Sequence, residues 1–289
     1  MYRFADQGRV DPIQFEVVSR TLDRRIRLRT LNPSVFESLR FLECTPDIVG
    51  PAPRDVVISI EPFRGYLRII ENGILIKEAL GPPSVLQFLH VHLFACSIDD
   101  RPRSPLIHAA CLRRGGRRLL LTGLKDAGKT TLTLRLIAAG FDIEADEHVF
   151  VTGAGVIARP RGCRVKEAAL QHFPEVADVI AAAPFYQHAT IGRIFNVDPR
   201  ALGSAWRIEE GSIDHVIVLQ PNHRGQSSIR PMQPSNLVRM LMREIGLREN
   251  GRGSAVAALA PMAGRTRAFD MSLGELKSAV RCVERVTRD

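Results

Sequence analysis

The sequence predicts an α/β fold in which a loop-bearing α/β domain follows a small strand-rich region. An apolar strand pattern, a glycine-bearing loop and an amphipathic helix pattern follow one another over residues 117–140. From residue 106 onward strand and helix patterns alternate, as a sheet flanked by helices requires. Before residue 99 the patterns are mostly those of strands. We therefore expect two domains, residues 1–98 and 99–289.

The first region contains short apolar runs, the later ones separated by the turn signals "FRGY" and "ENG". These runs predict strands over residues 15–20, 55–60, 66–71 and 73–78. The apolar run that follows two prolines predicts a buried helix over residues 84–98, beginning at Ser84. The polar, proline-bearing segment 99–105 is the best candidate for a linker.

The second region carries the alternating patterns. Strands are predicted over residues 106–114, 117–123 and 214–221, and extended structure over 141–151. A Gly115-Gly116 turn separates the first two strands. Helices are predicted over residues 129–140, 235–246 and 272–288, the last beginning with a capping box from Ser272 to Glu275. This alternation predicts a largely parallel sheet flanked by helices.

Composition narrows the class of protein. The chain has 289 residues, of which 45% are hydrophobic, as expected of a soluble protein with a buried core. Its net charge is +9, but the arginines are scattered and aromatics make up only 6%, which favours basic solvated faces over an anionic partner surface. We expect no nucleic-acid partner.

The cysteines and the apolar runs indicate a compartment. Five cysteines lie far apart without any C-x-x-C pair, which argues against a zinc site and a disulfide framework. The longest apolar stretch is too short and too polar to span a bilayer, and the first residues lack a signal-peptide core. We therefore expect a cytoplasmic protein with no membrane partner.

The stretch "LLLTGLKDAGKTTLTL", residues 119–134, matches the phosphate-loop pattern G-x-x-x-x-G-K-[ST]. Glycines let such a loop curl so that backbone N–H groups point at phosphate oxygens, and the following helix adds its positive end. Lys129 would reach the β- and γ-phosphates, and Thr130 would place its hydroxyl on Mg²⁺. The predicted nucleotide-binding residues are Gly123, Leu124, Lys125, Asp126, Ala127, Gly128, Lys129, Thr130 and Thr131.

A carboxylate near the γ-phosphate is the next requirement, and "IEADEHV" supplies Glu144, Asp146 and Glu147. Along a continuous strand Glu144 and Asp146 would share one face and Glu147 the other. If the strand ends at Ala145, Asp146 and Glu147 lie at the edge of the sheet, where ligands of open α/β folds bind. A solvated acidic turn is the alternative.

The position of these acids favours kinase chemistry over other nucleotide-dependent activities. An acid directly after the phosphate-loop helix can bind Mg²⁺ or accept a proton from an acceptor hydroxyl, as in small kinases. The later apolar strand ends in Gln220, whereas motor-type ATPases carry an acid there. The guanine-reading N-K-x-D of GTPases is also missing.

Residues 106–151 resemble the HPr serine kinase/phosphorylase family, and more closely its shorter HPr-kinase-related members. The resemblance rests on "H-A", the phosphate loop and the acidic pair after "GFDI". It implies a fold like that of phosphoenolpyruvate carboxykinase and transfer of the γ-phosphate of ATP, with Mg²⁺, to a protein serine. It also implies assembly into a homo-oligomer.

The resemblance assigns roles to individual positions. His108 matches the histidine near the transferred phosphate, and Asp146 would be the base or, with Thr130 and Glu147, a Mg²⁺ ligand. Catalytic roles are thus expected for Asp146, His108 and Lys129. Glu147 departs from the aspartate usual in the family. The acidic residue expected near Gly192 and Asn196 is absent, so phosphorylase activity is not expected.

Several other residues have two interpretations. His108, with a pKa near neutrality, could sense the phosphate in a pH-dependent way or be a core histidine. His90 and His92 would point to different helix faces and are not expected to bind metal. Trp206 is expected to pack. One of the basic residues after the predicted strands is expected to stabilise the transferred phosphate: Arg159, Arg161, Arg164, Lys166 or Arg224.

Two hypotheses of function remain after this reasoning. The first is an ATP- and Mg²⁺-dependent kinase whose acceptor is a serine of a small protein or peptide, or a small molecule. The second is a nucleotide-binding regulatory or assembly protein that uses the loop as a switch and transfers nothing. Residues 1–98 would recognise the acceptor or cover an edge of the sheet.

Overall fold

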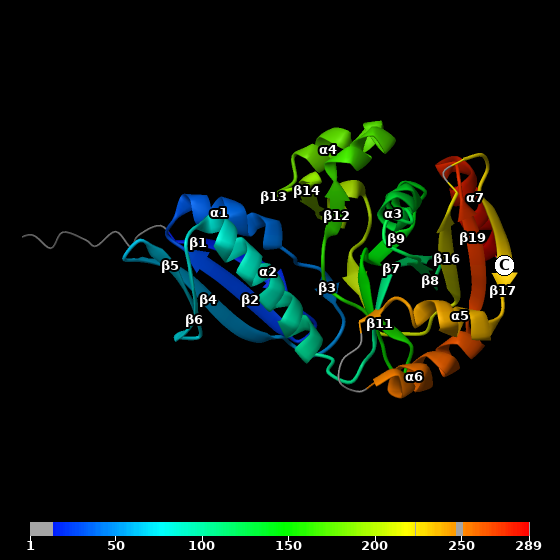
Figure 1. Cartoon of the computed structure of the whole chain (residues 1–289), viewed down its shortest axis with the longest axis horizontal. Helices are drawn as coiled ribbons and strands as arrows, with labels where there is room; N and C mark the ends of the chain where they lie inside the picture. The colour runs from blue at the N-terminus through cyan, green and yellow to red at the C-terminus, as the bar shows by residue number, and fades with distance from the viewer. Residues whose placement is uncertain (1–13, 223, 247–250, 289) are drawn as a thin grey trace, which may run out of the picture.

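The computed structural model describes residues 14–222, 224–246 and 251–288, and these residues form a mixed α/β structure with several sheets (Figure 1). A five-stranded sheet with two helices lies at one end of the long axis. A nine-stranded sheet lies toward the other end, and a three-stranded sheet lies beside it. A two-stranded pair, β3 (Asp47–Ile48) with β15 (Arg207–Ile208), joins the first region to the later chain.

The five-stranded sheet consists, in spatial order, of β1 (Phe15–Arg20), β2 (Arg24–Thr30), β4 (Arg54–Phe63), β5 (Tyr66–Glu71) and β6 (Ile74–Ala79). All neighbours pair antiparallel except β2 with β4. The four predicted strands are confirmed. The sequence pattern missed β2, because alternating arginines in "RRIRLRT" lower its apolar content although Ile26 and Leu28 are fully buried.

Two helices cover one face of this sheet, α1 (Pro33–Leu39) and α2 (Pro82–Asp99). The predicted start of the second helix at Ser84 was wrong. The helix begins at Pro82, because proline is well tolerated in the first turn, where its missing N–H has no helical partner. The short 3₁₀ segment η1 (Arg40–Leu42) follows α1.

The nine-stranded sheet has the order β11-β10-β7-β8-β16-β19-β17, and β9 and β18 also pair with β7. Its strands are β7 (Leu106–Arg114), β8 (Arg117–Thr122), β9 (Asp142–Ala145), β10 (His148–Val151), β11 (Val156–Ala158), β16 (His215–Pro221), β17 (Ser228–Met232), β18 (Ile245–Gly246) and β19 (Arg267–Leu273).

The prediction of a largely parallel sheet was wrong. Only β8, β16 and β19 run parallel, whereas every other pairing in this sheet is antiparallel. For β7 and β8 the reason is the short turn between them. Gly115 and Gly116 have φ values of 57° and 80°, and such a two-residue turn joins antiparallel neighbours.

Helices cover both faces of the large sheet. On one face α3 (Lys129–Ala138) and α7 (Leu276–Arg288) pack together, and on the other lie α5 (Pro234–Leu241) and α6 (Gly251–Arg265). The helix predicted over residues 235–246 ends at Leu241, since Ile245 and Gly246 pair with β7.

The capping box predicted at Ser272 was also wrong. Ser272 lies on β19, where it pairs with Gln220 of β16, and the helix begins only at Leu276. The ladder pairing removes Ser272 from the helix end, so the match to the capping pattern has no structural counterpart.

The three-stranded sheet was not predicted. It consists of β12 (Cys163–Lys166), β14 (Gly192–Val197) and β13 (Phe185–His188), with α4 (Ala177–Ala181) beside it. The 3₁₀ segments η2 (Glu167–His172), η3 (Pro174–Val176) and η4 (Pro199–Leu202) complete this part. Its apolar side packs against Leu134 and Ile137 of α3, which holds β12 next to the loop between β8 and α3.

Within the described residues, no helix combines the length and the apolar character needed to cross a bilayer.

One buried ion pair fixes the strand that leads to the site. Glu144 on β9 is 1% exposed, and its carboxylate receives two bonds from Arg118 of β8, Nε to Oε2 at 2.9 Å and Nη2 to Oε1 at 3.0 Å. The Cys111 thiol also donates to Oε2, at 3.1 Å. Glu144 therefore anchors β9 and lies outside the phosphate-loop site.

We predict that Glu144→Gln lowers the free energy of unfolding by about 3–5 kcal/mol, because it leaves the Arg118 guanidinium buried without a counter-charge. Urea unfolding measures this. The matched control is Glu78→Gln, which breaks the surface pair with Arg68 and should cost about 0–1 kcal/mol. Equal losses in the two variants would contradict the anchoring role of Glu144.

Candidate functional site

The loop between β8 and α3 needs glycine at both ends. Gly123 has φ 148° and Gly128 φ 91°, a conformation that L side chains rarely adopt. A Cβ on Gly123 would lie 2.7 Å from the carbonyl oxygen of Leu219, and one on Gly128 would lie 2.6 Å from Cδ2 of Leu273. The backbone of β16 therefore leaves no room for a side chain at position 123, and at position 128 the backbone conformation favours glycine.

Lys129 begins α3 and folds back over the loop. Its Nζ donates to the carbonyl oxygens of Gly123 at 2.5 Å and Leu124 at 3.1 Å, and the residue is 7% exposed. Burial lowers the pKa of the ammonium group, against the opposing effect of Glu244, Asp146 and Asp126. The amine thus lies among loop carbonyls, beside the loop N–H groups that would receive phosphate.

The bend between β9 and β10 places Asp146. Both strands pair with β7, with Ala145 opposite Cys111 and His148 opposite His108, so residues 146–147 leave the ladder between them. The strand ends at Ala145, the second of the two geometries expected from the sequence. Interruptions of this kind re-aim side chains next to ligand sites.

Asp146 points at the first turn of α3. Its Oδ2 accepts from Thr130 Oγ1 and from the backbone N–H of Arg164, both at 3.3 Å. The residue is 5% exposed, and its Oδ1 is buried without a hydrogen-bond partner among the described residues. Burial raises the pKa of this carboxyl, opposed by the Arg164 N–H, Arg161, Thr130 and Lys129.

The donors around Asp146 fit a magnesium ion. Mg²⁺ takes oxygen ligands and is typically held by one or two carboxylates together with substrate phosphates. The unpartnered Oδ1 of Asp146 and the hydroxyl of Thr130 are such oxygens. Among the described residues no group of three or more His, Cys, Asp or Glu side chains could hold a metal, so phosphate oxygens would have to complete the shell.

Glu147 differs from Asp146 in its surroundings. It forms an ion pair with Arg161, and its Oε2 lies 3.3 Å from Nδ1 of His148. Burial lowers the pKa of His148 to about 3, so this histidine is neutral at pH 7 and Arg161 is the charged partner. Glu147 is therefore already neutralised, and a metal would compete with Arg161 for it.

His108 lies on β7 beside the loop, with its ring stacked on that of His148 at a centroid distance of 5.4 Å. Burial, Lys129, His148 and Arg161 together lower the pKa of His108 to about 4. The expectation of titration near neutrality was therefore wrong. At pH 7 the imidazole is neutral and can accept or donate a hydrogen bond without carrying charge.

A cavity of about 340 Å³ gathers most of the residues predicted from the sequence. It is lined by His108, Lys125, Asp126, Gly128, Lys129, Thr130, Thr131, Asp146, Glu147, Arg161, Arg164, Lys166, Ala169 and Ile194. We call it the loop cavity. Gly123, Leu124 and Ala127 belong to the loop but do not line the cavity. Lys166 closes one side, with its Nζ 2.7 Å from Oδ1 of Asp126.

Besides Lys125 and Lys129 of the loop, the cations that line the loop cavity come from residues 161–166. Arg161, Arg164 and Lys166 line it, whereas Arg159 and Arg224 do not. Ala169 and Ile194 were not predicted to take part. Ala169 lies on η2, directly after β12, whereas the long-range pairing of β12 with β14 brings Ile194 there.

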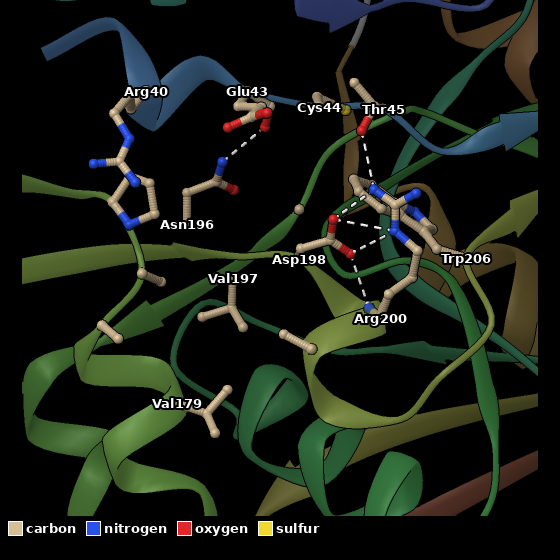
Figure 2. Close-up of a pocket in the computed structure, with 15 residues that line it drawn as sticks. Arg40, Glu43, Cys44, Thr45, Val179, Asn196, Val197, Asp198, Arg200 and Trp206 are labelled. Atoms are coloured by element: carbon tan, nitrogen blue, oxygen red, sulfur yellow. Dashed lines mark hydrogen bonds and ion pairs between the residues drawn. The ribbon is translucent and has the colours of Figure 1, made fainter. Parts of the chain in front are cut away.

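A second cavity, of about 420 Å³, lies where residues 40–45 meet the chain around β14 and η4 (Figure 2). Asn196 donates from Nδ2 to the carbonyl oxygen of Glu43 at 2.9 Å, and Arg200 bonds Asp198 and the hydroxyl of Thr45. Trp206 is 3% exposed and lines this cavity. Asn196 and Trp206 are therefore not in the loop cavity.

The two helix histidines are separate in the structure. His92 Nε2 lies 2.9 Å from Oε2 of Glu71, while His90 packs edge-on to Phe41. Arg224 lies in the exposed connection after β16.

No family model and no curated protein matches the chain. Among solved structures it is similar to the Hpr(Ser) kinase/phosphatase from Coxiella burnetii, with 13% sequence identity and a TM-score of 0.33, over 63% of this chain and 90% of that chain. A likeness at this TM-score carries no argument about activity. The function proposed below rests on the geometry of the loop cavity.

We predict that Asp146→Asn stabilises the nucleotide-free, Mg²⁺-free protein. Because the folded state raises the pKa of Asp146 above its ordinary 3.8, stability is lost as the pH rises through the folded pKa, and asparagine avoids this loss. The gain should therefore grow as the pH rises above 3.8 and then level off. Urea unfolding at several pH values measures it.

Asp126→Asn is the control for that measurement. Lys166 lowers the pKa of Asp126, so its ionised form is favoured in the folded protein and asparagine should bring no gain. Equal effects of the two substitutions at pH 8 would contradict the uncompensated burial of Asp146.

Proposed function

We propose that this protein is an ATP- and Mg²⁺-dependent kinase that transfers the γ-phosphate to a hydroxyl group. The observation that carries the proposal is the contact between Thr130 and Asp146, at 3.3 Å, inside a cavity walled by a phosphate loop. A Mg²⁺-bound triphosphate requires a hydroxyl from the start of the helix after the loop and, next to it, a carboxylate shielded from water. Most of the cavity's remaining polar residues are cationic, as a polyphosphate needs.

Magnesium would be held by Thr130 and Asp146, and when bound it would neutralise charge on the β- and γ-phosphate oxygens. Glu147 would join them only by giving up its pair with Arg161. Lys129, which lies on the carbonyls of Gly123 and Leu124, would swing toward the phosphates. The loop N–H groups would cradle them.

In the transfer step the protein positions the reactants, accepts one proton and stabilises charge. The acceptor oxygen forms a bond to the γ-phosphorus, the bond from that phosphorus to the bridging oxygen breaks, and ADP leaves with the bridging oxygen. The acceptor proton passes to Asp146, whose raised pKa makes it a better base than an ordinary aspartate. Arg161 and Arg164 would stabilise charge on the transferred group, and neutral His108 would hydrogen-bond to it.

The arrangement of the neighbouring strands supports a kinase over a motor-type ATPase. Strand β16 lies next to β8, with Val218 opposite Thr122, and Leu219 lies against Gly123 of the loop. No acidic residue of β16 lines the cavity. Of the three acidic residues that do, Asp126 belongs to the loop, and Asp146 and Glu147 come from the β9–β10 bend.

The acceptor is a serine of a small protein or peptide, or a small molecule, in this proposal. Residues 1–98 would form the unit that recognises it, and the enzyme would work as a homo-oligomer without phosphorylase activity. A cytoplasmic place fits five buried free cysteines.

We predict that label from γ-labelled ATP moves to an acceptor when the protein, Mg²⁺ and cell extract are combined. Asp146→Asn should lower the transfer rate about 10²- to 10⁴-fold, since it removes the base and the metal ligand together. Lys129→Ala should lower it through loss of nucleotide binding. Gel autoradiography and thin-layer chromatography measure transfer to proteins and to small molecules.

Asp142→Asn is the matched control. Asp142 lies on β9, four residues before Asp146 and outside the loop cavity, and it accepts a hydrogen bond from the backbone N–H of Ala205. It should transfer label at the wild-type rate. If ATP binds tightly but no label moves in any extract, and Asp146→Asn binds ATP unchanged, the protein is a nucleotide-dependent regulator and the kinase proposal fails.

A further inference from the structure

A third cavity lies between the two described above, and arginines dominate its lining. Four guanidinium groups reach it, those of Arg20, Arg159, Arg161 and Arg164, and no aspartate or glutamate lines it. We call it the arginine cavity. Cys44 also lines it, but burial raises the pKa of its thiol to about 11, so it supplies no negative charge.

These arginines have few partners. Arg159 is 5% exposed, and no hydrogen bond or ion pair joins its guanidinium to any described residue. The Nε atoms of all four arginines are buried without a hydrogen-bond acceptor. Arg161 has Glu147 as its counter-ion, and Arg164 donates from Nη1 to the carbonyl oxygen of Phe41 at 2.9 Å. Within the described residues, only Arg161 of the four thus forms an ion pair with a carboxylate. Asp146 acts at longer range on Arg161 and Arg164, and Asp47 acts on Arg20. Arg159 has no carboxylate partner of either kind among those residues.

Aromatic rings compensate only part of this charge. Arg159 lies over Phe94 at 4.7 Å and Arg164 over Phe41 at 3.7 Å. A cation over a ring gains roughly 0.5–2 kcal/mol, whereas removing an ion from water costs several kcal/mol. Consistent with that deficit, burial lowers the pKa of Arg159 and of Arg161 to about 10.

We propose that the arginine cavity is a binding site for a phosphate-type oxyanion, distinct from the phosphate loop. A tetrahedral oxyanion accepts hydrogen bonds from several guanidinium groups at once, as arginine clusters do for phosphate. The cavity has a volume of about 30 Å³. A single water needs roughly 10–15 Å³ of such space, so a small polyatomic ion fits and a whole metabolite does not.

The position of the cavity suggests where the anion comes from. It shares Arg161 and Arg164 with the loop cavity, and Cys44 and Gly162 with the second cavity of Figure 2. The anion is therefore either free phosphate or the phosphate group of a molecule whose remainder lies in the second cavity. The chemistry of the binding group is the same in both cases.

The test measures thermal unfolding of the full chain in the Lys129→Ala background, which weakens binding of phosphate at the loop. Inorganic phosphate replaces chloride at constant ionic strength, without nucleotide. We expect phosphate at one hundred times its Kd to raise Tm by about 5–10 °C. Adding Arg159→Gln should abolish this shift and leave Tm in chloride unchanged or higher, because one uncompensated charge is gone.

Arg40→Gln is the matched control. Arg40 lines the second cavity and pairs with Glu37 at the surface, so the phosphate shift should persist. If Arg159→Gln does not fold, Arg20→Gln is the substitute, because Arg20 lies at the half-buried rim. In equilibrium dialysis the Lys129→Ala protein should bind about one labelled phosphate per chain. Adding Arg20→Gln should weaken that affinity at least tenfold. No phosphate shift in the Lys129→Ala protein, or an undiminished shift with Arg159→Gln, would overturn the proposal.

Glycerol phosphate identifies the source. If glycerol phosphate binds more tightly than inorganic phosphate, and Trp206→Ala weakens this binding, the anion is the phosphate group of a molecule whose remainder lies in the second cavity. Binding of inorganic phosphate alone supports a free ion.

Discussion

The site depends on one contact, between the hydroxyl of Thr130 at the start of α3 and the carboxylate of Asp146 in the bend between β9 and β10. Two structural constraints meet there. Strand β16 lies so close to the loop that only glycine fits at position 123, and the positive φ of Gly128 favours glycine there as well. On the other side, β9 and β10 both pair with β7 and leave the intervening residues out of the ladder, so that Asp146 turns toward α3.

The charged groups around this contact have few partners within the protein. Asp146 keeps a buried oxygen without a partner, Lys129 lies on loop carbonyls, and Arg159 has no counter-ion among the described residues. Each arrangement costs folding free energy. A triphosphate with Mg²⁺ would supply the missing partners of Asp146 and Lys129, and an oxyanion would supply that of Arg159. Sites of this kind exchange stability for ligand binding.

Local signals in the sequence predicted the site better than the fold around it. The glycine spacing, the flanking strand and helix, and Asp146 could be read from neighbouring residues. Sheet direction could not be read from strand–helix alternation, because the Gly115-Gly116 turn makes β7 antiparallel. Strand β12 joins β14 by pairing residues about thirty positions apart, and the low pKa of His108 arises from tertiary burial. Neither leaves a local pattern.

The central claim is that Thr130 and Asp146 act on one shared Mg²⁺ ion. A double-mutant cycle tests it by measuring ATP affinity with and without Mg²⁺ in wild type, Thr130→Val, Asp146→Asn and the double variant. If Thr130 and Asp146 do act on one ion, Mg²⁺ tightens ATP binding in the wild type, each single variant loses most of this effect, and the double variant loses no more than either. Full additivity of the two losses, or no effect of Mg²⁺ on the wild type, would contradict it.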